Sequence, residues 1–349
     1  MEAGADIVDV YQIHGGDGDG ADIIFNFNGK RIAVSVFPSY SAGQQNQNSV
    51  QNRLIHLMDR IATGDVEDDE YDDMEDEILE IILNAGRPVF KAQTTPQIES
   101  KTSRDLHGII YPATSHFQLL GSSENAFIAP IKASEAYTLS ADDSYYQEAE
   151  ELELGIDLSL PWYSSRAILC TEVFVEGSGQ VASLVLVEDA EMFCKALGSA
   201  GGLIGTSVGR EMGCLQDIYD RLPPQHNATI HIPHLLGYVR HADTYRIIGF
   251  LRQWIPGQRL REMDVPKVSF QRRRKWHCQI RQAVRALHSK GIVWGDGKAS
   301  NVIVDEHDDA WLVDFGGGWT EGWVSEELAD TMEGDEQAIR RIGQFLQLN

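Results

Sequence analysis

The chain has 349 residues, an ordinary hydrophobic fraction of 42% and a formal net charge of −24 at pH 7, so it is long enough for one large domain or two smaller ones. This acidity argues against binding to nucleic acid or to anionic membranes, because like charges repel. No stretch approaches the roughly 18 uninterrupted apolar residues of a membrane span, and the acidic beginning MEAGADIVDV lacks the pattern of a signal peptide.

The charge is divided unevenly along the chain. Residues 1–160 hold 29 acidic and 9 basic side chains, whereas residues 161–349 hold 24 acidic and 20 basic ones. This asymmetry indicates two regions of different character, so we expect an acidic N-terminal α+β region over 1–160 and a second domain over 161–349. The four cysteines lie far apart without a CxxC pair, which favours reduced thiols in a cytoplasmic or nuclear protein over a secreted disulfide framework.

Regular elements are predicted early in the acidic region. In ADIIFNFNGKRIAVSVF (Ala21–Phe37), Asn28-Gly29 separates two β-rich runs, which is the strongest short-range signal of a β-hairpin. A helix is predicted next, because apolar residues recur at helical spacing from Val50 to Ile61 and Gly64 follows as a stop.

Ten of the thirteen residues from Asp65 to Glu77 are acidic. This composition is typical of a solvated, mobile loop; the alternative is an acidic clamp for a basic partner or for the chain's own Arg272-Arg273-Arg274-Lys275 run. A second helix is expected over Met74–Asn84, ending near Gly86-Arg87-Pro88. Short strands and turns are expected after it, and the acidic stretch at 148–153 is expected to mark the boundary of the region.

From about Trp162 the pattern becomes more regular. Strands are predicted over Ala167–Val175, Val181–Val187, Glu191–Ala196 and the apolar run Tyr245–Ile255, and helices around Met212–Leu222, Trp276–Leu287 and Ile339–Leu346. Pro223-Pro224 ends the first of these helices and Gly291 lies just past the second.

The stretch GIVWGDGKASNVIVDEHDDAWLVDFGGGW, Gly291–Trp319, carries the candidate chemistry. A loop with Asp296, Lys298 and Asn301 precedes two short predicted strands, and Asp314 follows them. Such a hairpin brings Asn301 and Asp314 close together, and their oxygen atoms suit a hard cation such as Mg²⁺. Asp296 is then expected to face a nucleophile, and Lys298 to neutralise charge on a transferred phosphoryl group.

The ordered set D-x-K-x-x-N, hairpin and D-F-G resembles the catalytic and metal-binding loops of the protein-kinase-like superfamily. WGDGKASNV, AWLVDFGGGWTEGWV and the later T-x-E-G-D (Thr331–Asp335) further resemble a group of divergent fungal kinase-like proteins. The resemblance covers the second region and implies an α+β, bilobal kinase-like fold that binds ATP and Mg²⁺. Its N-lobe is expected over about 161–252 and its C-lobe over about 256–349.

The resemblance also implies roles for residues outside this stretch. Lys195 in EMFCKAL takes the place of the lysine that holds the nucleotide phosphates, and Glu211 in GREMGCL that of the glutamate that pairs with it. The alternatives are a surface lysine and a solvated helix residue. Gly177 and Gly179 in GSGQVASL resemble a degenerate glycine-rich phosphate loop, or else form a plain hairpin turn.

A further resemblance lies in FLRQWIPGQRL, which is similar to the interlobe hinge of kinases. Backbone groups from Gln253 to Ile255 are then expected to bind adenine. The alternative is a strand end followed by a Pro-Gly turn.

The chain departs from the kinase pattern in two places. Trp294-Gly295-Asp296 replaces His-Arg-Asp, so the arginine that pairs with a phosphorylated activation loop is missing; Gly before Asp resembles small-molecule kinases of the aminoglycoside and choline type, and Trp294 suggests a packing role. Only 33 residues follow Gly316, without A-P-E, so the C-lobe is expected to be truncated. Gly334-Asp335 either replaces the buried aspartate that anchors the catalytic loop or serves as a helix N-cap.

Two functions remain open on the sequence. The first is an ATP-dependent phosphotransferase that moves the γ-phosphate to a hydroxyl of a protein or small molecule, and the retention of all five polar kinase positions favours it. The alternative is a pseudokinase, a scaffold that binds nucleotide or a partner, and the degenerate glycine run and the short C-lobe favour it. The eleven histidines show no metal-ligand spacing, so no zinc site is expected.

Overall fold

The protein divides into two compact units. The first consists of Met1–Thr102, Gly108–Ser144 and Gly177–Gly179, and the second of Ser103–His107, Tyr145–Glu176 and Gln180–Asn349. Both mix helices and strands, as expected for an α+β protein; the expected boundary at residue 160 stays a prediction. The computed structural model describes residues 6–16, 18–41, 44–45, 49–63, 68–93, 104–121, 125–137, 151–177, 179–198, 202–222 and 230–348.

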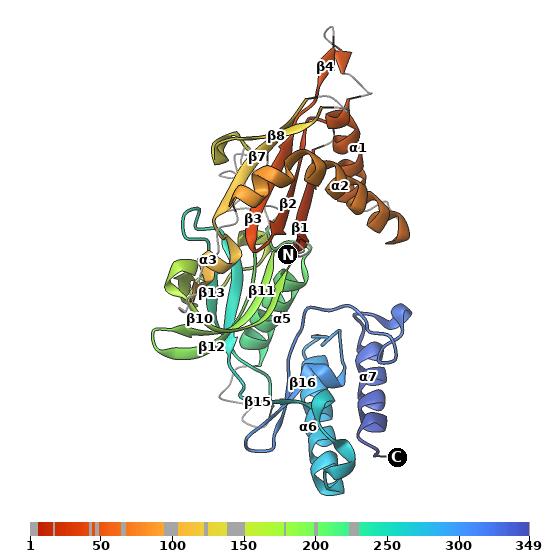
Figure 1. Cartoon of the computed structure of the whole chain (residues 1–349). Coiled ribbons are helices and arrows are strands. Elements are labelled where there is room, and N and C mark those ends of the chain that lie inside the picture. Colours follow the sequence, from red (N-terminus) through yellow and green to blue (C-terminus); the bar gives the residue numbers. More distant parts are fainter. Residues whose placement is uncertain are drawn as a thin grey trace, which may run out of the picture. The chain divides into compact units, whose positions relative to one another are not determined.

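The first unit is built on a five-stranded sheet with the order β1-β2-β3-β7-β8, in which β3 and β7 are parallel and the other neighbours antiparallel. Helices α1 and α2 pack their apolar residues against it (Figure 1). Its elements are β1 (Val8–Gly15), β2 (Ala21–Phe27), β3 (Lys30–Val36), β4 (Tyr40–Ser41), β5 (Gln44–Gln45), α1 (Val50–Thr63), α2 (Asp68–Gln93), β7 (Thr114–Leu120) and β8 (Phe127–Pro130).

The predicted hairpin and first helix are confirmed. Strands β2 and β3 pair with Phe27 opposite Lys30, and the two turn residues have positive φ, 48° at Asn28 and 79° at Gly29. This conformation requires residues such as Asn and Gly, because side chains with a branched or bulky Cβ clash there. Helix α1 ends at Thr63, directly before the expected stop at Gly64, which lies outside the described residues.

The loop expected over the acidic run is wrong for residues 68–77, and so is the expected end of the next helix; the acidic clamp stays a prediction. Helix α2 is already formed at Asp68 and runs to Gln93, because Met74, Ile78 and Ile82 recur at helical spacing and are buried in the core. Residues 64–67, the start of the acidic run, lie outside the described part.

Gly86 does not stop this helix because it has a packing role. A Cβ at this position would lie 2.4 Å from Cζ of Phe90 and 2.7 Å from Cγ1 of Ile128 on β8, so glycine allows α2 to approach the sheet closely. The helix continues through Pro88 as well, although proline removes one backbone donor.

The second unit contains a seven-stranded sheet, ordered β6-β10-β11-β12-β14-β13-β9, and a three-stranded sheet, β15-β16-β17. Helix α3 (Leu106–Ile110) contributes its first two residues to this unit. The other elements are β6 (Arg104–Asp105), β9 (Trp162–Ser164), β10 (Leu169–Gly177), β11 (Gln180–Val187), β12 (Ala190–Leu197), α5 (Ser207–Arg221), β13 (Leu235–Arg240), β14 (Ile247–Gln253), β15 (Gly257–Arg259), η6 (Leu260–Glu262), α6 (Phe270–His288), η8 (Ala299–Asn301), β16 (Val302–Asp305), β17 (Ala310–Leu312) and α7 (Met332–Phe345).

The helices of this unit begin where polar side chains cap them. The hydroxyl groups of Thr206, Ser269 and Thr331 accept hydrogen bonds from backbone N–H groups in the first turns of α5, α6 and α7, which satisfies donors that the helix leaves unpaired. The predicted strands β10, β11, β12 and β14 and all three helices are confirmed. The short strands β9, β13 and β15 were not predicted.

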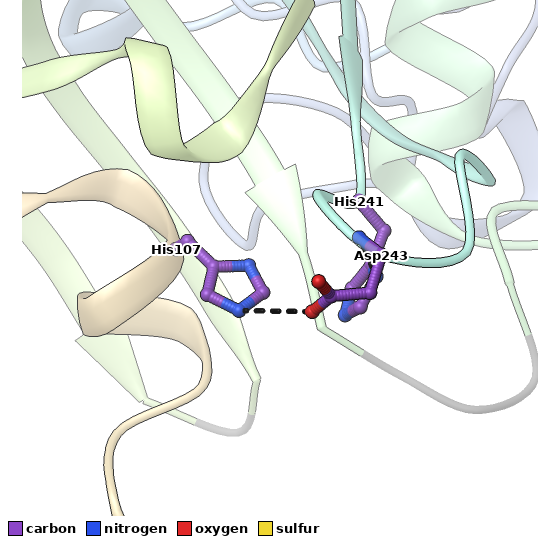
Figure 2. Close-up of side chains that lie close together, drawn as sticks. All are labelled: His107, His241 and Asp243. Atoms are coloured by element: carbon purple, nitrogen blue, oxygen red, sulfur yellow. Dashed lines mark hydrogen bonds and ion pairs between the residues drawn. The ribbon is translucent and has the colours of Figure 1, made fainter.

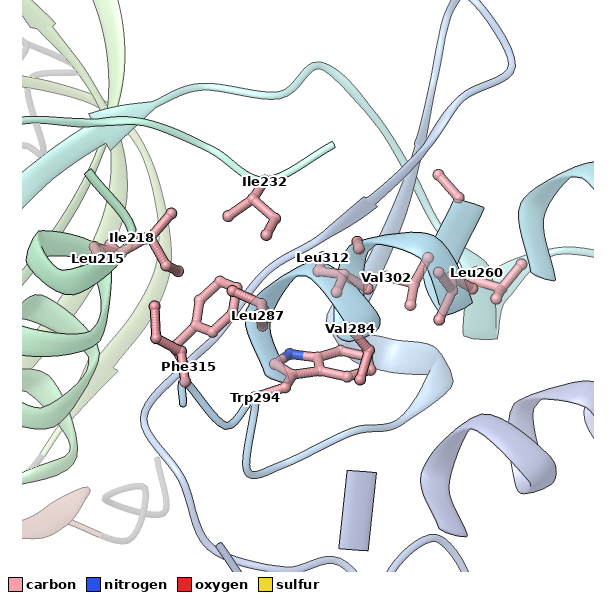
Figure 3. Packing of buried hydrophobic residues seen from close by; sticks show 14 of the residues in the cluster. Leu215, Ile218, Ile232, Leu260, Val284, Leu287, Trp294, Val302, Leu312 and Phe315 are labelled. Carbon is pink, nitrogen blue, oxygen red and sulfur yellow. The ribbon is translucent and has the colours of Figure 1, made fainter. Parts of the chain in front are cut away.

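The candidate motif contributes Trp294, Val302 and Phe315 to a large apolar core (Figure 3). Helix α6 contributes Trp276, Ile280, Val284 and Leu287, the side chains that the helical spacing had placed on one face, and all are buried. The described helices include none that is long and apolar enough to cross a membrane.

Candidate functional site

A cavity of about 460 Å³ in the second unit gathers residues from β10, β11, β12, α5, β14 and the β16–β17 hairpin. Its lining includes half of the ten predicted site residues: Lys195, Glu211, Ile255, Asn301 and Asp314. These positions are up to 119 residues apart in the chain. The fold therefore brings together side chains that only the motif order had connected.

Lys195 is the centre of the polar end of this cavity. Its Nζ donates to Oε2 of Glu211 at 2.7 Å and to Oδ1 of Asp314 at 3.1 Å. Lys195 stands on β12, between β11 and β14, and Glu211 is a fully buried residue of α5. The surface-lysine and solvated-glutamate alternatives are therefore excluded.

The electrostatics of the three groups are coupled. Burial lowers the pKa of Lys195, but the charges of Glu211 and Asp314 outweigh burial and raise it overall. Burial raises the pKa of the Asp314 carboxyl, and the adjacent Lys195 ammonium reverses the effect, so that this pKa lies below its ordinary value. At neutral pH the cavity thus holds an ammonium beside an ionised carboxylate.

Asn301 and Asp314 are held near each other by the β16–β17 hairpin. The backbone N–H of Val313 donates to the carbonyl oxygen of Asn301 at 3.0 Å, so the residue before Asp314 is fixed directly to Asn301. Asp314 adopts a left-handed backbone with φ of 63°, which aspartate tolerates better than most residues.

The side-chain oxygen atoms of Asn301 and Asp314 suit a hard divalent cation as ligands. The side-chain Nδ2 of Asn301 donates to the backbone oxygen of Asp296 at 2.8 Å, so its Oδ1 is the atom left to act as a ligand. Asp314 adds a carboxylate, and oxygen ligands of this kind suit Mg²⁺.

Asp296 does not line the cavity, but three neighbours fix its side chain. Oδ2 accepts from the ammonium of Lys298 and, at 3.3 Å, from Nδ2 of Asn301, and Oδ1 accepts from the hydroxyl of Thr320 at 2.9 Å. Lys298 also donates to the Thr320 hydroxyl at 2.9 Å. Asp296, Lys298, Asn301 and Thr320 thus form one network.

Sequence reasoning missed Thr320. It stands within the quoted motif DFGGGWTEGW, but no predicted element surrounds it. Only the fold reveals that the residue six positions after Asp314 returns to Asp296.

Asp335 anchors the loop that carries Asp296. Its carboxylate accepts from the backbone N–H groups of Trp294 and Gly295, each at 2.9 Å, and from Nε2 of His288 at 2.8 Å. Burial raises the pKa of this carboxyl, although the three hydrogen bonds oppose the shift. Thr331 is the N-cap of α7, so of the two alternatives for Asp335 the anchor agrees with the structure.

Trp294 is a packing residue, as the sequence suggested. Its ring is fully buried, near Val284 and Leu287 in Figure 3, and its Nε1 donates to the carbonyl oxygen of Val313 at 3.1 Å. This bond connects the Asp296 loop to the residue that precedes Asp314.

Three predicted nucleotide-binding positions do not join the cavity lining: Gly177, Gly179 and Gln253. Gly177 ends β10 and Gly179 lies in the turn with φ of 76°, and the lining includes residues on both sides of this turn, Val175 and Gln180. The N–H of Gln253 donates to the carbonyl of His234 at 2.9 Å. Of the predicted hinge, Trp254 and Ile255 line the cavity.

Arg252, another residue that sequence reasoning missed, lines the same cavity and is buried. Its guanidinium lies 3.8 Å from the ring centroid of Phe193. The signal was present in FLRQWIPG, because an arginine at the end of an apolar strand is unusual.

A second cluster lies outside this cavity and joins His107, His241 and Asp243, whose ligand atoms all lie within 4.8 Å of one another (Figure 2). Arg166 donates to both carboxylate oxygens of Asp243, at 2.7 and 3.0 Å. Nδ1 of His241 accepts from the backbone N–H groups of residues 243 and 244. Because a cation already neutralises the carboxylate, the cluster fits a structural junction better than a metal site.

Comparison with solved structures finds a likeness to a chain titled "Structure of vaccinia related kinase 3", at 15% sequence identity and a TM-score of 0.41. The match covers 52% of this chain and 65% of that one, just under two thirds of its length. No family model and no curated protein matches the sequence. A TM-score this low is a weak likeness, and the function proposed below is drawn from the side chains of the site.

Proposed function

We propose that the chain is a phosphotransferase of the protein-kinase-like superfamily, which moves the terminal phosphoryl group of a nucleoside triphosphate to a hydroxyl acceptor. One observation carries the proposal: Nζ of Lys195 bonds both Glu211 and Asp314 in a cavity that also contains Asn301. The second domain then has an N-lobe over about 161–252 and a C-lobe over about 256–349.

In this proposal the polar end of the cavity holds the phosphates. Lys195, oriented by Glu211, binds phosphate oxygens, and Asn301 and Asp314 hold Mg²⁺. Mg²⁺ held by these two residues would neutralise charge on the phosphate oxygens. Glu211 holds Lys195 in place, because its Oε2 accepts a hydrogen bond from Nζ of Lys195.

Asp296 is placed to act on the acceptor. It orients the acceptor hydroxyl and takes its proton as the new oxygen–phosphorus bond forms and the bond to the leaving nucleoside diphosphate breaks. Lys298 stabilises the charge of the transferred group. The acceptor remains either a protein or a small molecule.

A nucleotide-binding scaffold without turnover is the second candidate. One observation favours it: Gly177 and Gly179 are absent from the described lining of the cavity.

The test measures phosphoryl transfer with water as acceptor, by release of labelled phosphate from Mg²⁺-nucleotide. Wild type is compared with Asp296→Asn, and with Asp264→Asn as a control at an exposed position. The proposal predicts that Asp296→Asn loses roughly 10²-fold or more in turnover and keeps nucleotide affinity. Nucleotide binding without phosphate release by wild type would favour the scaffold. Phosphate release that Asp296→Asn retains would overturn the role of Asp296, and a wild type that binds no nucleotide would overturn both candidates.

A further inference from the structure

Arg252 is a buried cation that the proposed chemistry leaves without a task. It is 4% exposed and lines the cavity. Its Nη1 donates to the carbonyl of the next residue, Gln253, at 3.1 Å. Its Nε is buried and has no hydrogen-bond partner among the described residues. Because Nε is inaccessible, only Nη1 and Nη2 can reach a ligand in the cavity. A buried cation is costly unless it is well paired, and the described hydrogen bond to Arg252 comes from a neutral carbonyl, which points to a ligand that completes its pairing.

The charge of Arg252 persists in this setting. Burial lowers its pKa to about 10, and the nearby carboxylates of Glu211 and Asp314 counteract that effect. Arg252 is therefore protonated at neutral pH and offers only donors. Lys195 already bonds both carboxylates, so Arg252 makes no direct ion pair with either in the described structure.

The rest of the cavity fits a planar base. If phosphates occupy the end formed by Lys195, Asn301 and Asp314, the base lies against the remaining wall. That wall is aromatic: the ring of Phe174 stacks on Trp254 at 5.6 Å and 10°, and on Phe193 at 6.4 Å and 11°. Flat aromatic surfaces of this kind suit stacking with a nucleobase.

Arg252 lies beside this wall, because its guanidinium covers the ring of Phe193 and Trp254 follows two positions later in the chain. We propose that Arg252 reads the polar edge of the base and makes the cavity prefer guanine to adenine nucleotides. This inference rests on the proposed function, and it replaces the expected ATP with GTP as the donor.

The chemical reason is the pattern of donors and acceptors. Guanine presents two adjacent acceptors, O6 and N7, which match the fork of an arginine. Adenine presents an amino donor in place of O6, and a donor facing Arg252 leaves both groups unsatisfied. A site built around such a hydrogen bond rejects the wrong partner strongly, so a preference of about tenfold or more is expected.

The experiment measures equilibrium dissociation constants for GTP, ITP and ATP, each with Mg²⁺. ITP keeps O6 and N7 but lacks the 2-amino group, so it isolates the edge that Arg252 is proposed to read. Wild type is compared with Arg252→Met and Arg252→Lys, and with Arg274→Met on the exposed face of α6 as the matched control. Melting without nucleotide reports whether each variant folds.

We expect GTP and ITP to bind wild type at least about tenfold more tightly than ATP, and Arg252→Met to bring the three constants together. Equal or tighter binding of ATP by wild type would overturn the inference while the proposed function stands, and this comparison needs no variant. A uniform loss for all three nucleotides in Arg252→Met would also overturn it, since Arg252 would then contact phosphate. Absence of binding for all three would overturn the proposed function as well.

Discussion

Oδ2 of Asp335 accepts a hydrogen bond from the backbone N–H of Trp294 at 2.9 Å, across 41 residues of sequence. Because Oδ1 of Asp335 also accepts from Gly295, one buried carboxylate sets the backbone directly before Asp296. The position of the proposed catalytic carboxylate therefore depends on the start of α7.

Replacing Asp335 with asparagine tests this anchor. The amide group points an N–H donor at a backbone donor, so at least one of the two loop bonds is lost. We expect the free energy of unfolding to fall by about 1–3 kcal/mol and turnover to decrease. Denaturant melts of Asp335→Asn and of the exposed neighbour variant Glu336→Gln measure the effect. Equal stability of the two variants would contradict an anchoring role.

Thr320 is predicted to position Asp296. Thr320→Val keeps the shape but removes the hydroxyl that donates to Asp296 and accepts from Lys298. We expect kcat for phosphate release to fall about tenfold, the equivalent of one lost hydrogen bond, with KM for nucleotide unchanged and activity restored in Thr320→Ser. A rise in KM with unchanged kcat would show that Thr320 acts on nucleotide binding instead.

Arg210 on α5 bonds Asp330, which also accepts from the backbone N–H of Gly318 at 2.9 Å. This ion pair connects the segment after Asp314 to α5, and it needs no phosphorylated side chain to do so. Because both side chains are more than a third exposed, the pair is expected to add only about 0.2–1 kcal/mol to stability. Loss of the pair is expected to cost more in the activation free energy of turnover than in the free energy of unfolding.

A double-mutant cycle tests whether the two residues act as a pair. Turnover is measured for Arg210→Met, Asp330→Asn and the double variant, and the double variant is expected to lose no more turnover than the less active of the two single variants. Losses that multiply would mean that the residues act independently.

The His107–His241 cluster predicts an acid sensitivity. Burial, together with Arg166, lowers the pKa of both imidazoles, and Asp243 and, for His107, Asp105 oppose the shift without reversing it. The folded protein therefore holds these histidines neutral at pH values where the unfolded chain, with an ordinary pKa of about 6.5, binds protons. Stability should fall as pH drops through about 6.5.

His241→Asn tests this sign. The Asn Oδ1 can accept the same two backbone N–H groups as Nδ1 of His241, but the side chain no longer titrates. We expect a smaller drop in melting temperature between about pH 8 and about pH 5.5 than in wild type. His307→Asn, in an exposed turn, should leave the drop unchanged. An unaltered drop in His241→Asn would exclude this residue as a source.

The local elements of the fold were predictable because their signals are local. Asn28-Gly29 dictates its turn through positive φ, and the apolar spacing of α6 identifies its buried face. The loop expected over the acidic run was wrong because composition hides the helical spacing of Met74 and Ile78, which are buried while Asp72, Asp73 and Asp76 are exposed. The helix end expected near Gly86 was wrong for a different reason. Gly86 is required by its close contact with β8, a strand about 40 residues away in the sequence.

The sequence predicted which residues form the candidate site, but not the hydrogen bonds that connect them. The order of Asp296, Asn301 and Asp314 implied proximity, and the hairpin provides it. Thr320 and Arg252 carry no spacing rule of their own, because one lies in irregular chain and the other at the end of a strand. Their partners are decided by tertiary structure alone.

The central claim is tested most directly by the melting temperature with and without Mg²⁺-nucleotide, using GTP and ATP separately, for wild type and Asp314→Asn. A ligand at about 100 times its dissociation constant stabilises the folded state by about 2.7 kcal/mol, which corresponds to a shift of about 5 °C or more. We predict a magnesium-dependent shift in wild type that disappears in Asp314→Asn and persists in the exposed control Asp264→Asn. A wild type that shows no shift with either nucleotide, or a shift that Asp314→Asn retains, would contradict the account.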